Sequence, residues 1–185
     1  MRLYGCWRSW RWCPVGYQIL VVGYNEDSCT DIARALAYEV GAEIARRGCI
    51  LVTGGLGGVM AAAARGAREN GGITVSILPQ KETSAANPYS TVKIATGLSH
   101  MRNMVNVWSS DGVIVVGGGA GTLIEVAVAY LEGKPIVAVS GSGGVADEYA
   151  GKYLDDRQRV LIHRAGSPRE AVEKVIRLAS EGQQP

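Results

Sequence analysis

The chain has 185 residues, a length typical of a single domain with a substantial hydrophobic core. Its 19 Lys and Arg residues against 17 Asp and Glu residues give a formal net charge of +2, and no run of five like charges occurs. Neither a nucleic-acid partner nor an anionic-membrane partner is therefore expected. No segment reaches the roughly 18 apolar residues that a transmembrane helix needs.

The four cysteines bear on metal binding and on the cellular compartment. Their positions, Cys6, Cys13, Cys29 and Cys49, match no zinc pattern, so no metal is expected. Reduced thiols in a cytoplasmic protein are the simplest interpretation. A bridge between Cys6 and Cys13 stays open as an alternative.

Residues 1–16 differ in composition from the rest of the chain. They contain three of the four tryptophans and three arginines: Trp7, Trp10, Trp12, Arg2, Arg8 and Arg11. We expect a peripheral N-terminal extension over residues 1–16 and one Rossmann-like domain over residues 17–181. Stacking on nucleic acid and insertion at a membrane surface are the alternatives for the extension.

From Tyr17 onward, short apolar runs alternate with helical periodicity. A strand over 18–22 leads through a polar loop, 23–28, to a helix that Thr30 caps and Gly48 ends. The apolar residues of this helix recur every four positions: Ile32, Leu36, Val40 and Ile44.

The same alternation continues to the C-terminus. Further strands are predicted at 50–52, 73–78, 91–95, 113–116, 136–139 and 160–162. Further helices are predicted at 59–69, 101–109, 122–131 and 147–153, and from Ser167 onward with the buried stripe Val172, Val175, Ile176 and Ala179. This order predicts an α/β protein with a modified Rossmann fold: a doubly wound, mostly parallel sheet with helices on both faces.

Three glycine-bearing loops follow strands, at 23–28, 54–58 and 117–121. Ligands of such sheets bind beyond the carboxyl ends of the strands, at the point where the strand order reverses. The first turn carries Gly23 alone and lacks the dinucleotide fingerprint, which disfavours an NAD enzyme.

The loop at 117–121 is the most informative segment, because it joins a β-branched strand to a helix. We expect Gly118, Gly119, Gly121 and Thr122 to bind a phosphate through backbone N–H groups, with a further bond from the Thr122 hydroxyl. A tight turn with positive φ explains one or two of the glycines as an alternative. Valine at Gly119 or Gly121 is expected to block the cradle, because such positions need positive φ or a close backbone approach.

The loop at 54–58 also precedes a helix. Gly54, Gly55, Gly57 and Gly58 are expected to hold a ribose or a second phosphate. A plain tight turn is the alternative.

Three segments together resemble the Lonely-guy superfamily over roughly Tyr17 to Ser180: Gly54-Gly55-Leu56-Gly57-Gly58-Val59-Met60, Arg102, and Gly118-Gly119-Ala120-Gly121-Thr122-Leu123-Ile124-Glu125. This superfamily contains nucleoside-monophosphate phosphoribohydrolases once mislabelled lysine decarboxylases. The chain is most similar to its molybdenum-cofactor carrier branch. In the hydrolases the second motif begins with Pro and the Arg is followed by Lys. Gly117 and Asn103 stand at those positions here and fit the carrier branch.

The resemblance implies binding of a phosphorylated nucleotide or pterin, such as AMP or a molybdopterin-type ligand, with no cofactor required and with Met60 in the binding site. The alternative is hydrolysis of the N-glycosidic bond of a nucleoside 5′-monophosphate to free base and ribose 5-phosphate.

Two residues would carry such a hydrolysis. Glu125 would bond the ribose hydroxyls and stabilise oxocarbenium-like charge, or activate water, and Arg102 would anchor the phosphate or stabilise the transition state. The alternatives are a glutamate that favours the helix dipole and an arginine on a solvated face. His100 is interpreted as structural, and Lys134 as a charge at a helix C-terminus.

The resemblance further implies a homodimer or a larger homo-oligomer. The helix at 122–131 is apolar nearly all round, and one sheet can cover only one of its sides. The helix at 101–109 carries an apolar stripe of Met101, Met104, Val105 and Trp108, which core packing explains equally well. We expect both helices at a subunit boundary.

Overall fold

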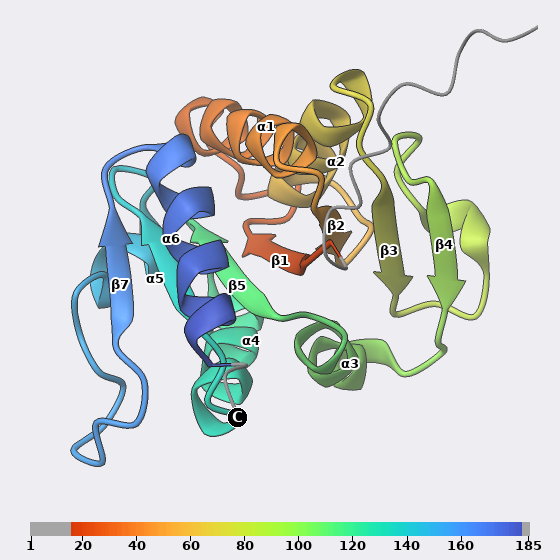
Figure 1. Ribbon diagram of the computed structural model, residues 1–185. Helices are drawn as coiled ribbons and strands as arrows, with labels where there is room; N and C mark the ends of the chain where they lie inside the picture. The colour runs from red at the N-terminus through yellow and green to blue at the C-terminus, as the bar shows by residue number, and fades with distance from the viewer. Residues whose placement is uncertain (1–15, 183–185) are drawn as a thin grey trace, which may run out of the picture.

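The computed structural model describes residues 16–182, and Figure 1 shows the arrangement of its helices and strands. Within these residues a seven-stranded sheet has the order β4-β3-β2-β1-β5-β6-β7, and every pairing in it is parallel. The strands are β1 Gln18–Gly23, β2 Ile50–Thr53, β3 Thr74–Leu78, β4 Val92–Ala95, β5 Gly112–Val116, β6 Ile136–Val139 and β7 Ile162–Ala165. The predicted fold class, a doubly wound α/β sheet, is confirmed.

The strand order reverses between β1 and β5. The chain moves outward from β1 through β2 and β3 to β4 at one edge, then returns to β5 and continues through β6 to β7 at the other edge (Figure 1). Loops that leave neighbouring strands in opposite directions open a crevice at such a reversal. The crevice here lies at the carboxyl ends of β1 and β5.

Helices cover both faces of the sheet, and alternate strand residues serve the two faces. Ile19 and Val21 of β1 pack with α1 (Asp31–Arg46), α2 (Gly58–Glu69) and α6 (Pro168–Glu181). Leu20 and Val22 of the same strand pack in the opposite layer, with α3 (Arg102–Trp108), α4 (Ala120–Leu131) and α5 (Gly144–Tyr149). Two single-turn 3-10 helices, η1 Thr83–Ala85 and η2 Ser99–Met101, flank β4.

Two predicted elements were wrong in their bounds. The last strand was placed at 160–162, whereas β7 spans Ile162–Ala165, because an edge strand can carry polar residues such as His163 outside the core. The helix placed at 147–153 is α5, which ends at Tyr149, because Gly151 has a φ of +80° and turns the chain back toward β7.

The stripe predicted for α1 is confirmed at Val40 and Ile44, with Leu36 packed partly buried against the core, and is wrong at Ile32. Ile32 is 63% exposed, while Ala33, Ala37 and Gly41 are buried together with Val40 and Ile44. Small residues occupy this face because α1 and α2 are in backbone contact: a Cβ at Gly41 would overlap the carbonyl of Ala63. The predictions for residues 1–16, including a Cys6–Cys13 bridge, lie almost wholly outside the described residues.

Large apolar side chains stay exposed on α3 and α4. Met101, the last residue of η2, and Trp108, the last residue of α3, are exposed, as are Ile124 and Leu131 of α4. This exposure argues against the core interpretation for Met101 and Trp108, whereas Val105 packs against the core, and the homodimer stays a prediction. Among residues 16–182 no helix is both long and apolar enough to cross a membrane.

Candidate functional site

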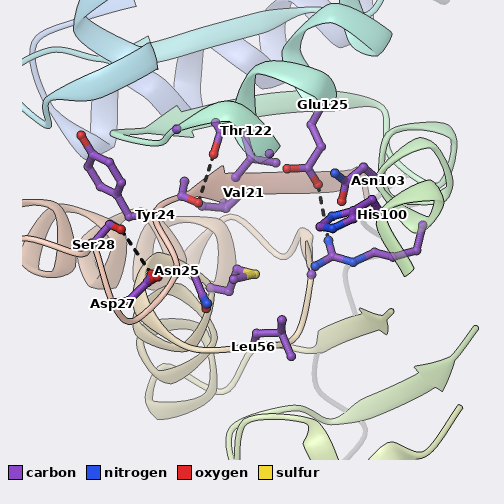
Figure 2. Close-up of a pocket in the computed structure, with 17 residues that line it drawn as sticks. Val21, Tyr24, Asn25, Asp27, Ser28, Leu56, His100, Asn103, Thr122 and Glu125 are labelled. Atoms are coloured by element: carbon purple, nitrogen blue, oxygen red, sulfur yellow. Dashed lines mark hydrogen bonds and ion pairs between the residues drawn. The ribbon is translucent and has the colours of Figure 1, made fainter. Parts of the chain in front are cut away.

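A pocket of about 320 Å³ opens at the crevice between β1 and β5. It is lined by all three glycine-bearing loops: 23–28, 54–58 and 117–121. Figure 2 shows Tyr24 at one end of the pocket and Glu125, Asn103 and His100 at the other. The fold therefore brings three segments that are far apart in the sequence to one cavity.

The N-terminus of α4 opens into this pocket. Gly119 is the N-cap residue, no side chain accepts a hydrogen bond from the first turn, and Gly119 and Gly121 both line the cavity. The first amides of a helix have no partner within it and carry the positive end of its dipole. This end of α4 is therefore suited to an anionic group such as a phosphate.

The N-terminus of α2 is arranged differently, because a side chain of the protein already occupies it. Glu26 Oε2 accepts a hydrogen bond of 2.6 Å from the Gly58 amide, and Arg34 holds the same carboxylate at 3.0 Å. Of the residues predicted here as ligand contacts, Gly54 and Met60 line the pocket, and Gly55, Gly57 and Gly58 do not. A phosphate at Gly58 would have to displace the carboxylate of Glu26.

The glycines of the 117–121 loop serve two different purposes. Gly117 and Gly118 have φ values of +62° and +105°, so they form the tight turn, and Gly118 is absent from the pocket lining. Gly119 has a φ of −120°, Gly121 is helical, and a Cβ at either position would meet nothing within 4 Å. The prediction that Gly119 and Gly121 need positive φ or a close approach was therefore wrong. A larger side chain at either would instead project into open pocket space.

Thr122 lines the pocket, but its hydroxyl already has a backbone partner. Thr122 Oγ1 donates a hydrogen bond of 3.1 Å to the carbonyl of Gly23 (Figure 2). This bond ties the start of α4 to the end of β1. The hydroxyl oxygen retains its lone pairs, so a ligand could only donate to it.

Arg102 and Glu125 meet in the buried wall of the pocket. Arg102 is 8% exposed and Glu125 is 7% exposed, and Arg102 Nη1 lies 3.6 Å from Glu125 Oε1. The guanidinium lies over Gly54, where any Cβ would overlap it. The alternative of an arginine on a solvated helix face is therefore wrong, and the ion pair links α3 to α4.

Asn106, on the next turn of α3, holds the same carboxylate. Its side chain is fully buried, and Nδ2 donates a hydrogen bond of 2.6 Å to Glu125 Oε1. Oε1 thus faces both Arg102 and Asn106, while Oε2 has no partner within residues 16–182. The oxygen left for a ligand is therefore Oε2.

Burial controls the protonation of this glutamate. Removal of the carboxyl from water raises the pKa of Glu125 to about 7, although the Asn106 hydrogen bond and the Arg102 charge both oppose the rise. Burial likewise lowers the pKa of Arg102, against the opposing effect of Glu125. A carboxyl group with a pKa of about 7 can hold or release a proton near neutral pH.

Several pocket residues were not singled out from the sequence. Tyr24, Asn25, Asp27 and Ser28 line the pocket from the first loop, whose position was predicted without roles for its residues. His100, interpreted as structural, is exposed at the pocket wall. Asn103 was noted from the sequence only as a departure from the Lys of the hydrolases, and Asn106, which holds Glu125 without lining the pocket, was not singled out.

Lys134 has a different role from the one predicted. Its ammonium group donates to the carbonyls of Trp108 and Ser110 and so caps the C-terminus of α3 instead of that of its own helix. No group of three or more His, Cys, Asp or Glu side chains within residues 16–182 is arranged to hold a metal ion.

Comparison with known proteins places the chain in a family. The model of the SLOG cluster4 family matches residues 16–172. An uncharacterized protein of Archaeoglobus fulgidus is 46% identical over 66% of this chain and 79% of its own length. A cytokinin riboside 5′-monophosphate phosphoribohydrolase of Mycobacterium tuberculosis is 41% identical over 56% of this chain, which spans only 60% of that enzyme.

Solved structures cover nearly the whole chain. The X-ray structure of TM1055 superposes with a TM-score of 0.81 at 39% identity, over 87% of this chain and 99% of that one. The molybdenum cofactor binding protein of Rippkaea orientalis gives a TM-score of 0.78 at 34% identity, over 88% and 96%. The molybdenum cofactor carrier protein of Chlamydomonas reinhardtii gives 0.76 at 33%, over 89% and 99%.

The predicted resemblance is confirmed, since the family model matches residues 16–172 and solved structures with the same fold align over almost the full chain. The chain belongs to the SLOG cluster4 family, a Lonely-guy-like family, and within it to the branch similar to molybdenum cofactor carrier proteins.

Proposed function

We propose that the chain binds a phosphorylated nucleotide or pterin, with the phosphate at the N-terminus of α4. The observation that carries this proposal is the uncapped start of α4, which opens into a pocket of about 320 Å³ beside the buried Arg102–Glu125 pair. A volume of this size suits a small ligand of the nucleotide class. No cofactor is needed for such binding.

Two departures from the hydrolase motif support a carrier-like function. The related hydrolases have Pro where this chain has Gly117, and Gly117 adopts a φ of +62°, which proline cannot reach. A Cβ at Gly117 would also overlap the ring of Tyr24, a pocket residue. The second departure is Asn103, which puts a neutral carboxamide where the hydrolases have a cation. Asn103 lines the pocket, and Gly117 lies behind it against Tyr24.

The second candidate function is hydrolysis of a nucleoside 5′-monophosphate, in which water and AMP would give adenine and ribose 5-phosphate. Glu125 favours it, because a carboxyl group with a pKa of about 7 and a pocket-facing Oε2 is equipped for proton transfer. Arg102 would then stabilise negative charge on the ligand beside it. The mycobacterial relative is named for a reaction of this type.

One experiment separates the two functions. The native protein and the Glu125→Gln variant are incubated with AMP, adenine is measured by chromatography, and AMP affinity is measured by calorimetry. In parallel, molybdenum cofactor released anaerobically from a molybdoenzyme is passed with the protein over a sizing column, and the co-eluting pterin is measured by its fluorescence after oxidation.

We expect AMP or the pterin to bind without release of adenine. Adenine release that Glu125→Gln abolishes would instead establish the hydrolase. Failure of both AMP and the pterin to bind would refute ligand binding and leave a scaffold role.

A further inference from the structure

A second cavity of about 300 Å³ adjoins the first. The two cavities share Leu56, His100, Arg102 and Asn103, which form the wall between them. Pro79, Gln80 and Ser99 complete the second cavity, from the loop after β3 and the start of η2. The site is therefore larger than the pocket at the start of α4.

Asn103 is the residue of this shared wall that offers both a hydrogen-bond donor and an acceptor on an uncharged side chain. It is 6% exposed, and its carboxamide makes no hydrogen bond with any residue of the described part of the chain. The carboxamide atoms are not fully buried, since the fully buried side-chain polar atoms without a partner in the described residues are Arg102 Nε, Asn106 Oδ1 and Ser140 Oγ. Because Asn103 lines both cavities, its unpaired donor and acceptor are available to a ligand that passes between them.

The lining of the second cavity indicates what part of a ligand it takes. Leu56 and Pro79 supply apolar surface, while Gln80, Ser99 and Asn103 supply uncharged donors and acceptors. His100 and Arg102 also line it, and the Arg102 guanidinium is paired with Glu125. No Asp or Glu of the described residues lines it. Apolar walls with a few neutral polar groups suit a planar heterocycle, and a carboxamide can pair with an adjacent donor and acceptor on its edge.

The order of groups along the site matches the order of groups in a nucleotide. The start of α4, marked by Thr122 in Figure 2, lies in the middle of the first cavity, Glu125 lies one turn further along the helix, and Asn103 lies beside Glu125. A nucleoside monophosphate carries phosphate, sugar and base in this same sequence. A phosphate at α4 would put the sugar at Glu125 and direct the base past Asn103.

We propose that the second cavity binds the heterocycle of the ligand and that Asn103 is the residue that recognises its hydrogen-bonding edge. The class of ligand is then a phosphorylated compound whose ring carries neighbouring donor and acceptor atoms, as purines and pterins do. This proposal rests on the proposed function, because it takes the phosphate at α4 as its starting point.

The test compares AMP with ribose 5-phosphate, which lacks the heterocycle, by calorimetry, with adenine release checked in each sample. The native protein is expected to bind AMP at least about tenfold more tightly than ribose 5-phosphate. Asn103→Leu should remove most of this difference by weakening AMP binding alone. Asn70→Leu is the matched control, because Asn70 lies outside both cavities.

A second variant protects the test against misfolding of Asn103→Leu. Gln80 is exposed at the second cavity, so Gln80→Trp should fill that cavity with little effect on the fold, and it too should weaken AMP but not ribose 5-phosphate. Equal affinity of the native protein for the two ligands, or an unchanged AMP preference in the folded variants, would overturn the second-cavity proposal while phosphate binding stands. Failure of both ligands to bind would overturn both proposals.

Discussion

Replacement of Glu125 by glutamine should change how stability depends on pH. Burial raises the pKa of Glu125 from its ordinary 4.5 to about 7. Between these values the folded protein keeps a proton that the unfolded chain has released, so the free energy of unfolding falls as pH rises through this window. The difference between the two pKa values corresponds to about 3 kcal/mol of free energy of unfolding, all of which is lost once the pH exceeds the pKa of the folded protein.

Glu125→Gln keeps the shape of the side chain and an acceptor for Asn106, but it has no proton to lose. Denaturant unfolding from about pH 4.5 to about pH 8 should therefore show a decline in the native protein that the variant lacks, by about 3 kcal/mol. Glu148→Gln is the control, since Glu148 is exposed on α5. Parallel pH profiles for the native protein and Glu125→Gln would refute the buried, proton-holding glutamate.

Three further predictions follow from the same geometry. Gly119→Val should abolish AMP binding without unfolding the protein, because its side chain would project into the pocket. The control Gly166→Val lies outside the pocket and should bind AMP normally in calorimetry. Normal AMP affinity in folded Gly119→Val would show that AMP does not bind at the start of α4. Asn106→Leu should raise the pKa of Glu125 above about 7, because the variant lacks the hydrogen bond from Asn106 that lowers this pKa in the native protein. An NMR titration of the carboxyl carbon with an unchanged midpoint would contradict this prediction. Light scattering at micromolar concentration should give the mass of at least a dimer for the native protein. Leu131→Glu should weaken this association, because Leu131 is exposed on α4. A monomeric mass for the native protein would refute the predicted homodimer.

The sequence predicted the parts of the fold that depend on local pattern. The run Val113–Val116 followed by clustered glycines predicted a strand, a turn and a helix, and β5 and α4 have this arrangement. The edge strand β7 was misplaced, because an edge strand tolerates polar residues and loses the apolar pattern. Local pattern also could not tell a glycine that forms the turn, such as Gly118, from one that leaves space for a ligand, such as Gly119.

The parts of the site that depend on long-range contact were not predictable. Asn106 of α3 donates a hydrogen bond to Glu125 of α4, 19 positions further along the sequence, and nothing in the sequence around either residue predicts the pairing. Glu26 fills the N-terminus of α2 from 32 positions away, which removes an anion site that the glycines of 54–58 suggested. Such pairings follow from the packing of helices on the sheet, not from the spacing of residues along one element.

The central claim is that a phosphate binds at the start of α4, and NMR of the uniformly ¹⁵N-labelled protein tests it most directly. Addition of ribose 5-phosphate should shift the amide signals of Gly119, Ala120 and Gly121 at the open helix end. A separate cavity between α1 and α2 is lined by Arg34 and Arg65. Shifts confined to that cavity or to Gly58, with the signals of 119–121 unmoved, would contradict the account.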